Sequence, residues 1–232
     1  MGPITPSGKR LFSPAVWGIV AFTACYMGIA LAATVRYQNA EFKIYLAVMT
    51  VMLGVVLIIH SFVRLSTLTL LGLSIWGAAH MAGGLWHVPD SWTVTEQSRV
   101  LYNWWVIPGW LKFDQLVHFN GFGLVTWICW QGVRSAFQRR GVIIEPTFGV
   151  MTLCVAAGMG FGAFNEVIEF IATRVLPQTN VGGYENTGWD LVANLLGSIA
   201  MAIVISAYYR ANSAFGSKSG TGSVLAEGDK SP

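Results

Sequence analysis

Acidic, imidazole and amide side chains gather near one end of four hydrophobic segments of this chain. They are His80 and His87, Asp114 and His118, Glu166 and Glu169, and Asp190 and Asn194. An ionisable group at membrane depth costs several kcal/mol, so it is kept where it has a function or a partner. If successive segments cross a membrane in alternating directions, all of these side chains come to lie on the same side. We therefore expect them to form one polar site.

Asp114 and His118 are four residues apart, which places them one turn apart on one face of a helix. The carboxylate could orient the imidazole as in a general acid–base pair, or both groups could bind one metal ion. A structural alternative stays open for Asp114, which could cap the first turn of its helix. His118 lies about 6 Å deeper by helical rise, so capping does not explain it.

Glu166 and Glu169 are three residues apart and also share a helix face. Two carboxylates this close repel each other unless a cation or a shared proton lies between them. The pair therefore implies a metal ion, a shared proton or an arginine, for which Arg36, Arg99 and Arg174 are the candidates.

Asp190 and Asn194 repeat the four-residue spacing at the start of the last apolar segment. Asp190 is either a helix cap or a site residue, and Asn194 needs a buried partner, such as a hydrogen bond to another helix. His80 and His87 are seven residues apart, on nearly the same face but about 10 Å apart along the axis, so they do not readily bind one ion together. His80 is the deeper of the two.

The segments that carry these residues belong to an integral membrane protein. The 232 residues are 54% hydrophobic and 11% charged, with a mean hydropathy of +0.56, whereas a soluble domain is about a quarter charged. Apolar stretches near the ~20 residues needed to cross hydrocarbon predict an all-α polytopic membrane bundle of about six transmembrane helices. The transmembrane domain is expected over 1–211, followed by a disordered cytoplasmic tail over 212–232. The expected spans are 14–33, 44–63, 67–89, 114–133, 147–172 and 189–209.

Positive charge predicts the orientation of the bundle, because cytoplasmic flanks carry an excess of lysine and arginine. With the N-terminus inside, nine basic residues are cytoplasmic and five lie on the opposite side. The cytoplasmic set is Lys9, Arg10, Arg64, Arg134, Arg139, Arg140, Arg210, Lys218 and Lys230, and the opposite set is Arg36, Lys43, Arg99, Lys112 and Arg174. Both termini are therefore expected in the cytoplasm, with the first helix uncleaved, and the net charge of +3 is no indication of nucleic-acid binding.

The connection over 90–113 is long and aromatic. It carries Trp92, Tyr102, Trp104, Trp105 and Trp110 with few charges. One interpretation is an aromatic belt at the outer membrane interface, where amphipathic rings lie at headgroup level. The other is an interfacial lid over the polar site that admits a lipid-like substrate.

Three short motifs resemble a known family. Asp114-Gln115-Leu116-Val117-His118-Phe119 resembles the D-x-x-x-H-F motif of the YjdF-like inner-membrane proteins, and Glu166 to Phe170 resembles their E-x-x-E-W. The segment from Trp189 to Asn194 resembles their W-D-x-x-x-D, with asparagine for the second acid. Asp190, Asn194 and Gly197 are also similar to a D-x-x-x-N-x-x-G motif of VanZ-like proteins. The resemblance covers about 80–200 and implies a multi-pass protein of a bacterial inner membrane, in families without a settled activity.

The leading hypothesis is a polar, metal-binding site in the extracytoplasmic half, acting as an enzyme on a lipid-linked or envelope substrate. His80, His118, Glu166, Glu169 and Asp190 are the candidate ligands, and Asp114 orients His118. His118, Glu166, Glu169 and Asp190 are also candidate acid–base groups, with Asn194 and His87 in support. Such a ligand set would suit zinc, manganese or iron.

Two other functions stay open. A transporter would use the same carboxylates to carry protons or ions, and a scaffold would use them only to tie helices together. Membrane lipids are the expected surroundings, no nucleic acid is expected, and protein partners do not follow from the sequence. The chain has no nucleotide-binding loop and no G-x-S-x-G nucleophile motif.

Overall fold

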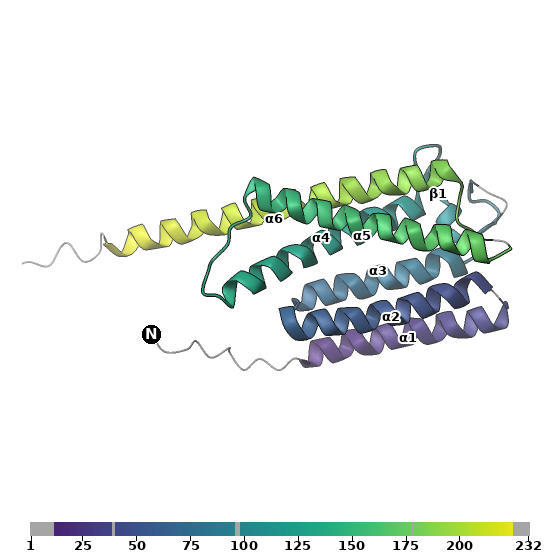
Figure 1. The fold of residues 1–232 in the computed structure, drawn as a ribbon, viewed down its shortest axis with the longest axis horizontal. Helices are drawn as coiled ribbons and strands as arrows, with labels where there is room; N and C mark the ends of the chain where they lie inside the picture. Colours follow the sequence, from purple (N-terminus) through teal and green to yellow (C-terminus); the bar gives the residue numbers. More distant parts are fainter. Residues whose placement is uncertain (1–11, 39, 96–97, 178, 225–232) are drawn as a thin grey trace, which may run out of the picture.

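Six long helices make up most of the protein. A computed structural model describes residues 12–38, 40–95, 98–177 and 179–224. The helices are α1 (Pro14–Arg36), α2 (Ala40–Val63), α3 (Thr67–Leu85), α4 (Phe113–Gln138), α5 (Phe148–Val175) and α6 (Tyr184–Val224). They run up and down in turn, so α1 begins and α6 ends at the same end of the bundle (Figure 1). The predicted all-α bundle is confirmed.

The connection between α3 and α4 has structure of its own. It contains the 3-10 helix η1 (Leu101–Asn103) and a small antiparallel hairpin of β1 (Trp105–Ile107) and β2 (Leu111–Lys112). The hairpin turns at Gly109, whose φ of +75° favours glycine. We call the end of the bundle that carries this connection, together with the α1–α2 and α5–α6 connections, the hairpin end (Figure 1).

Five of the helices are long and apolar enough to cross a membrane: α1, α2, α3, α5 and α6 as far as Asn212. This confirms the membrane bundle. Helix α4 is 26 residues long but is not among the five. It packs against α3, α5 and α6, and its buried polar side chains, including Gln115, His118 and Thr126, lower its hydropathy.

The helix bounds differ from the expected spans at several ends; for example, α4 ends at Gln138 and not at residue 133, and α6 begins at Tyr184 and not at residue 189. Helix α3 ends at Leu85 instead of residue 89, because the backbone of 86–88 bonds to residues 99–101. Helix α6 continues to Val224. The disorder expected over 212–232 stays a prediction. Residues 225–232 of the predicted tail, and Lys9, Arg10 and Lys230 of the charge comparison, lie outside the described residues.

The helices pack as two groups of three. Figure 1 shows α1, α2 and α3 on one side of the molecule and α4, α5 and α6 on the other, with α3 against α4 where the groups meet. Close approach depends on small residues: a Cβ at Gly197 of α6 would collide with the backbone carbonyl of Phe119 on α4. The start of α6 is thereby held tightly against the start of α4, where the candidate residues lie.

Candidate functional site

The candidate residues of three helices meet at the hairpin end. Helix α4 supplies Asp114 and His118 in its first two turns, α5 supplies two glutamates near its end, and α6 supplies an aspartate and an asparagine near its start. Two groups of three residues have ligand atoms within 4.8 Å of one another. These groups are Asp114, His118 and Asp190, and His118, Glu166 and Glu169. The structure therefore brings together the predicted residues of α4, α5 and α6, with His118 at their centre.

His118 lies between the two groups and is only 2% exposed. Its Nδ1 is 3.0 Å from Oδ1 of Asn194 and 3.6 Å from Oε1 of Glu166, and its Nε2 is 3.7 Å from Oδ1 of Asp114. A carbonyl oxygen can only accept, so Nδ1–H donates to Asn194, while Nε2 faces Asp114. Asn194 thereby finds the buried inter-helix partner that the sequence required.

Asp114 and Asp190 are joined by an asparagine that the sequence reasoning missed. Asn186 donates its amide to Oδ2 of Asp114 at 3.4 Å and to Oδ2 of Asp190 at 2.6 Å. Its own carbonyl accepts a hydrogen bond from Nζ of Lys112, which is buried. The only signals in the sequence were the spacings, since Asn186 precedes Asp190 by four residues and Lys112 precedes Asp114 by two. Lys112 was instead counted among the flanking charges.

Neither Asp114 nor Asp190 is the N-cap residue of its helix. The residue at the cap position of α4 is Lys112, and Oε1 of Gln115 accepts the Lys112 backbone N–H at 3.0 Å. Asp190 lies well inside α6, which begins at Tyr184, and its side chain is fully buried. Both carboxylates face other side chains. They belong to the cluster that we call the polar centre, which consists of Asp114, His118, Glu166, Glu169, Asn186, Asp190 and Asn194.

Among the described residues, no arginine forms an ion pair with Glu166 or Glu169. Arg99 pairs with Asp90 at 3.2 Å and donates to backbone carbonyls of its own loop. Glu169 accepts the amide of Asn165 at 2.9 Å. Glu166 is 8% exposed, and neither of its oxygens has a hydrogen-bond partner among the described residues. The arginine explanation of the pair is therefore wrong.

The two earlier histidines do not join the centre. His87 lies beyond the end of α3, is exposed, and pairs through its backbone with Val100, so the predicted shared face with His80 is wrong. The His80 ring packs between Trp76 and Tyr102, with ring centroids 6.0 and 5.6 Å apart, and belongs to neither ligand group. The chain leaves the helix after Leu85 to pair with the loop, which removes His87 from the α3 face.

Tyr102 of η1 ties the connection to helix α3. Its hydroxyl donates to the carbonyl of His80 at 2.7 Å. Burial raises the pKa of this phenol well above its ordinary value, and the carboxylates of Asp114 and Glu169 raise it further. Tyr102 therefore stays neutral and keeps its donor. The sequence named it only as one aromatic residue of a belt or lid.

At the tip of the hairpin, Trp110 is 83% exposed and Ile107 is 52% exposed, whereas the rings of Trp92 and Trp104 stack with centroids 4.3 Å apart. Both predicted roles of this connection, belt and lid, are compatible with an exposed apolar tip.

Another buried carboxylate lies on the α2 side of the hairpin end, apart from those around His118. Glu41 is 5% exposed and accepts both the backbone N–H of Asn180, at 2.9 Å, and its side-chain amide, at 2.8 Å. This contact ties α2 to the α5–α6 connection. Each Glu41 oxygen thus has a hydrogen-bond partner, and nothing in the sequence marked this residue.

The polar centre ends halfway down the bundle. Ser198 and Thr126 are fully buried, and both donate to the carbonyl of Phe122, at 3.4 and 2.8 Å. Beyond them the space between α4, α5 and α6 is filled by an apolar cluster. This cluster consists of Trp130, Met151, Cys154, Ala202 and Ile205. Polar groups are thus concentrated at the hairpin end of these three helices.

Comparison with known proteins identifies the family. Residues 16–211, which include all of α2 to α5 and most of α1 and α6, match the model of a family described as predicted membrane protein (DUF2238). The chain matches none of the curated proteins and none of the solved structures with which it was compared. The YjdF-like proteins are this family, so that prediction is confirmed. The chain therefore belongs to the DUF2238 family of predicted membrane proteins.

Proposed function

We propose that this protein is a membrane enzyme that holds one divalent metal ion at the hairpin end, with Asp114, His118 and Asp190 as its ligands. The observation that carries the proposal is the meeting of these ligand atoms within 4.8 Å, beside a buried oxygen, Oδ1 of Asp190, that has no hydrogen-bond partner among the described residues. A buried carboxylate oxygen without a donor is costly, and a cation supplies what the protein does not.

The excess of negative charge around His118 supports the same proposal. Four carboxylates, those of Asp114, Glu166, Glu169 and Asp190, lie around His118, and Lys112 contributes one positive charge through Asn186. Unbalanced negative charge in a membrane bundle costs several kcal/mol per group unless protons or a cation neutralise it. A divalent ion bound by two aspartates removes most of that imbalance.

The second group of residues, His118, Glu166 and Glu169, fits a role in supporting the proposed metal site. The Nδ1–H of His118 is bonded to Asn194 and lies 3.6 Å from Glu166, an arrangement that leaves Nε2 free to bind a metal and raises the basicity of the ring. Glu166 and Glu169 would then serve as acid–base groups or as further ligands. A mixed set of imidazole and carboxylate suits zinc, manganese or iron, and an ion so held lowers the pKa of a bound water enough to make it a nucleophile.

The polar side chains between α4, α5 and α6 lie only toward the hairpin end among the described residues, and this favours an enzyme over a transporter. A carrier of protons or ions needs a polar path through the bundle, whereas the cluster of Trp130, Met151, Cys154, Ala202 and Ile205 lies on the far side of the centre. The positive-charge count further suggests that both termini are cytoplasmic and that the hairpin end is extracytoplasmic. We therefore propose a lipid-linked or envelope substrate reached from that side, and that α4 crosses the membrane with the other five helices.

The proposed setting is the inner membrane of a bacterium, as the YjdF-like resemblance implies. The match of Asp190, Asn194 and Gly197 to the VanZ-like motif adds a second proposed relationship.

Metal content of the purified protein tests the proposal. After reconstitution with zinc, manganese or ferrous iron and removal of free metal, mass spectrometry should find close to one ion per chain. His118→Ala and Asp190→Asn should lose it. Two matched controls at the same end, His87→Ala and Asp90→Asn, should retain it, because both residues are exposed. No stoichiometric metal in the wild type, or equal metal in all variants, would refute the proposal.

A scaffold is the second candidate, favoured by the hydrogen bonds that cross between helices. The bond of His118 to Asn194 joins α4 to α6, and Asn186 holds both aspartates. If these bonds are the whole role of the cluster, Asn194→Ala lowers thermal stability by the same amount whether or not metal is added. A metal enzyme instead shows added stability with metal in the wild type, which His118→Ala loses.

A further inference from the structure

We propose that Glu166 and Glu169 of α5 bind a second, exchangeable divalent cation, a proposal that rests on the function proposed above. In that function the first ion is held by Asp114, His118 and Asp190, and the glutamates are left as acid–base groups or further ligands. The geometry around His118 points to a separate ion for the glutamates, on the other side of the imidazole ring.

One ion cannot bind the carboxylates of both groups as they lie in the structure. Two oxygens bound to the same ion at about 2.2 Å are at most about 4.4 Å apart. Among the described residues, no group whose ligand atoms lie within 4.8 Å of one another contains both an aspartate and a glutamate. His118 alone belongs to both groups, with Nε2 at 3.7 Å from Asp114 and Nδ1 at 3.6 Å from Glu166. An ion on the aspartate side therefore leaves the glutamates without a cation.

The Glu166 side chain is the observation that calls for a ligand. It is 8% exposed, and neither of its carboxylate oxygens has a hydrogen-bond partner among the described residues. The nitrogen that it faces, Nδ1 of His118, already donates its proton to Asn194 at 3.0 Å. A buried carboxylate without a donor is unfavourable, and a cation between Glu166 and Glu169 would neutralise both at once.

The ligands of the second site differ from those of the first. Because Nδ1 of His118 carries the proton donated to Asn194, it cannot bind an ion, so only carboxylate oxygens and water remain. The Asn165 amide donates to Glu169 at 2.9 Å and orients that carboxylate. Carboxylate and water ligands suit manganese and magnesium.

The second ion should exchange more readily than the first. It has two protein ligands against three, and none of them is an imidazole. Glu169 is only half-buried, which gives an ion a way to the pair that does not pass the first site. Removal of free metal should therefore strip the second ion and leave the first.

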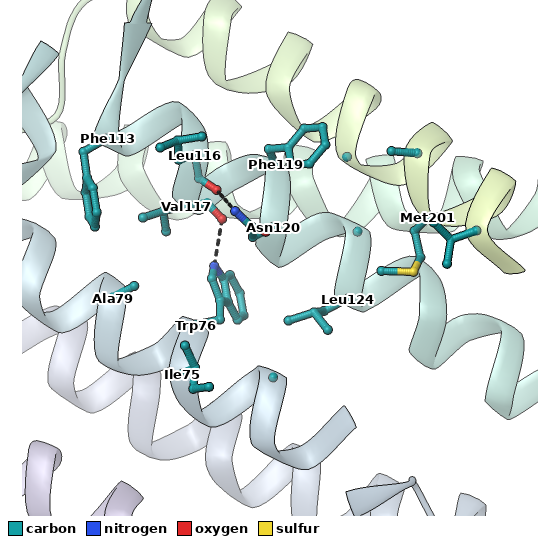
Figure 2. A pocket seen from close by; sticks show the side chains of 15 residues that line it. Ile75, Trp76, Ala79, Phe113, Leu116, Val117, Phe119, Asn120, Leu124 and Met201 are labelled. Carbon is teal, nitrogen blue, oxygen red and sulfur yellow. Dashed lines mark hydrogen bonds between the residues drawn. The ribbon is translucent and has the colours of Figure 1, made fainter. Parts of the chain in front are cut away.

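The groove between α3, α4 and α6 does not offer a competing place for an ion. Figure 2 shows that its polar side chains are bonded to the α4 backbone: the Asn120 amide donates to Leu116 at 2.8 Å, and the Trp76 indole N–H donates to Val117 at 3.0 Å. No acidic side chain among the described residues lines it. A second ion bound by the protein is therefore at the α5 glutamates or at an exposed carboxylate, and a control variant separates these two.

Titration of the purified protein with Mn²⁺, with free Mn²⁺ counted by electron paramagnetic resonance, tests the proposal. The wild type should bind two ions per chain while free Mn²⁺ is present and keep one after its removal. Glu166→Gln and Glu169→Gln should each bind only the first ion, because an amide lacks the charge of the carboxylate. Asp190→Asn should bind only the second. Glu185→Gln, which changes an exposed glutamate at the same end, is the matched control and should bind both.

The possible results separate the two proposals. One ion in the wild type, lost in Asp190→Asn but kept in both glutamate variants, would overturn the second ion and leave the first, with the glutamates neutralised by protons. No ion in the wild type would overturn both. Two ions in both glutamate variants would place the second ion elsewhere and also overturn the proposal. One ion that is lost in the glutamate variants and kept in Asp190→Asn would support the glutamate site and overturn the aspartate one. The wild-type count alone can refute the second ion, even if a glutamate variant fails to fold.

Discussion

An alanine at Gly197 should push α4 and α6 apart at the level of the polar centre. The added Cβ would collide with the Phe119 carbonyl oxygen and would lie 2.7 Å from the Phe119 carbonyl carbon, where ordinary contact begins at 3.4 Å. The backbone of α4 cannot rotate out of the way as a side chain could. The two helices must therefore separate by at least 3.4 − 2.7 = 0.7 Å.

This separation falls one turn from the bond between His118 and Asn194. If the full 0.7 Å were transmitted, the 3.0 Å distance from Nδ1 to Oδ1 would become 3.7 Å, beyond hydrogen-bonding range. Overpacking costs about 1–3 kcal/mol, and stranding a buried polar group costs about 1–3 kcal/mol more. The better helix propensity of alanine returns up to about 1 kcal/mol. We expect a net loss of about 2–4 kcal/mol in the free energy of unfolding.

Equilibrium unfolding in mixed micelles of increasing SDS fraction measures this loss. The matched control is Gly28→Ala on α1, where a Cβ meets nothing within 4 Å, so propensity alone should leave stability equal or slightly higher. The two Gly→Ala changes should therefore differ in sign. Equal stabilities for Gly197→Ala and Gly28→Ala would refute the contact between α4 and α6 on which the geometry of the site depends.

Two further predictions concern asparagines at the hairpin end. Asn180→Ala removes one of the two hydrogen bonds to Glu41 and should cost about 1–2 kcal/mol, with faster hydrogen exchange in residues 176–183; unchanged exchange there would show that the Glu41 contact does not hold the loop. Asn186→Ala removes the bridge between Lys112 and Asp190, so calorimetry should show a metal affinity reduced about 10–100-fold, and an unchanged affinity would mean that the bridge does not orient the ligands.

The sequence was sufficient to predict that His118 and the carboxylates of α4, α5 and α6 converge. Spacings of three and four residues place Glu166 with Glu169 and Asp114 with His118 on single helix faces, and alternating helices bring their polar ends to one side. The spacing argument is local to one helix, and the alternation argument depends only on the direction in which each helix runs. Neither argument requires knowledge of which helix lies beside which.

The missed residues depend on lateral packing. Lys112 and Asn186 lie 74 positions apart in the chain, and Glu41 and Asn180 lie 139 apart. Only the arrangement of helices in the plane of the membrane brings such pairs together, and periodicity along one helix carries no information about it. His87 was misplaced for a related reason, since α3 gives way to a loop whose pairing partner is 13 residues further on.

The helix that carries His118 is the one of the six long helices that is not apolar enough to be counted as a membrane span, and this bears on how it would enter a membrane. A segment with an aspartate, a histidine and several amides partitions poorly into lipid when it arrives alone, because each charged group at depth costs about 3 kcal/mol. If α4 crosses the membrane as we propose, its insertion would depend on its neighbours, because the groups of α5 and α6 that contact its polar face emerge from the ribosome after it. We would then expect the polar centre to assemble together with the completion of the membrane topology.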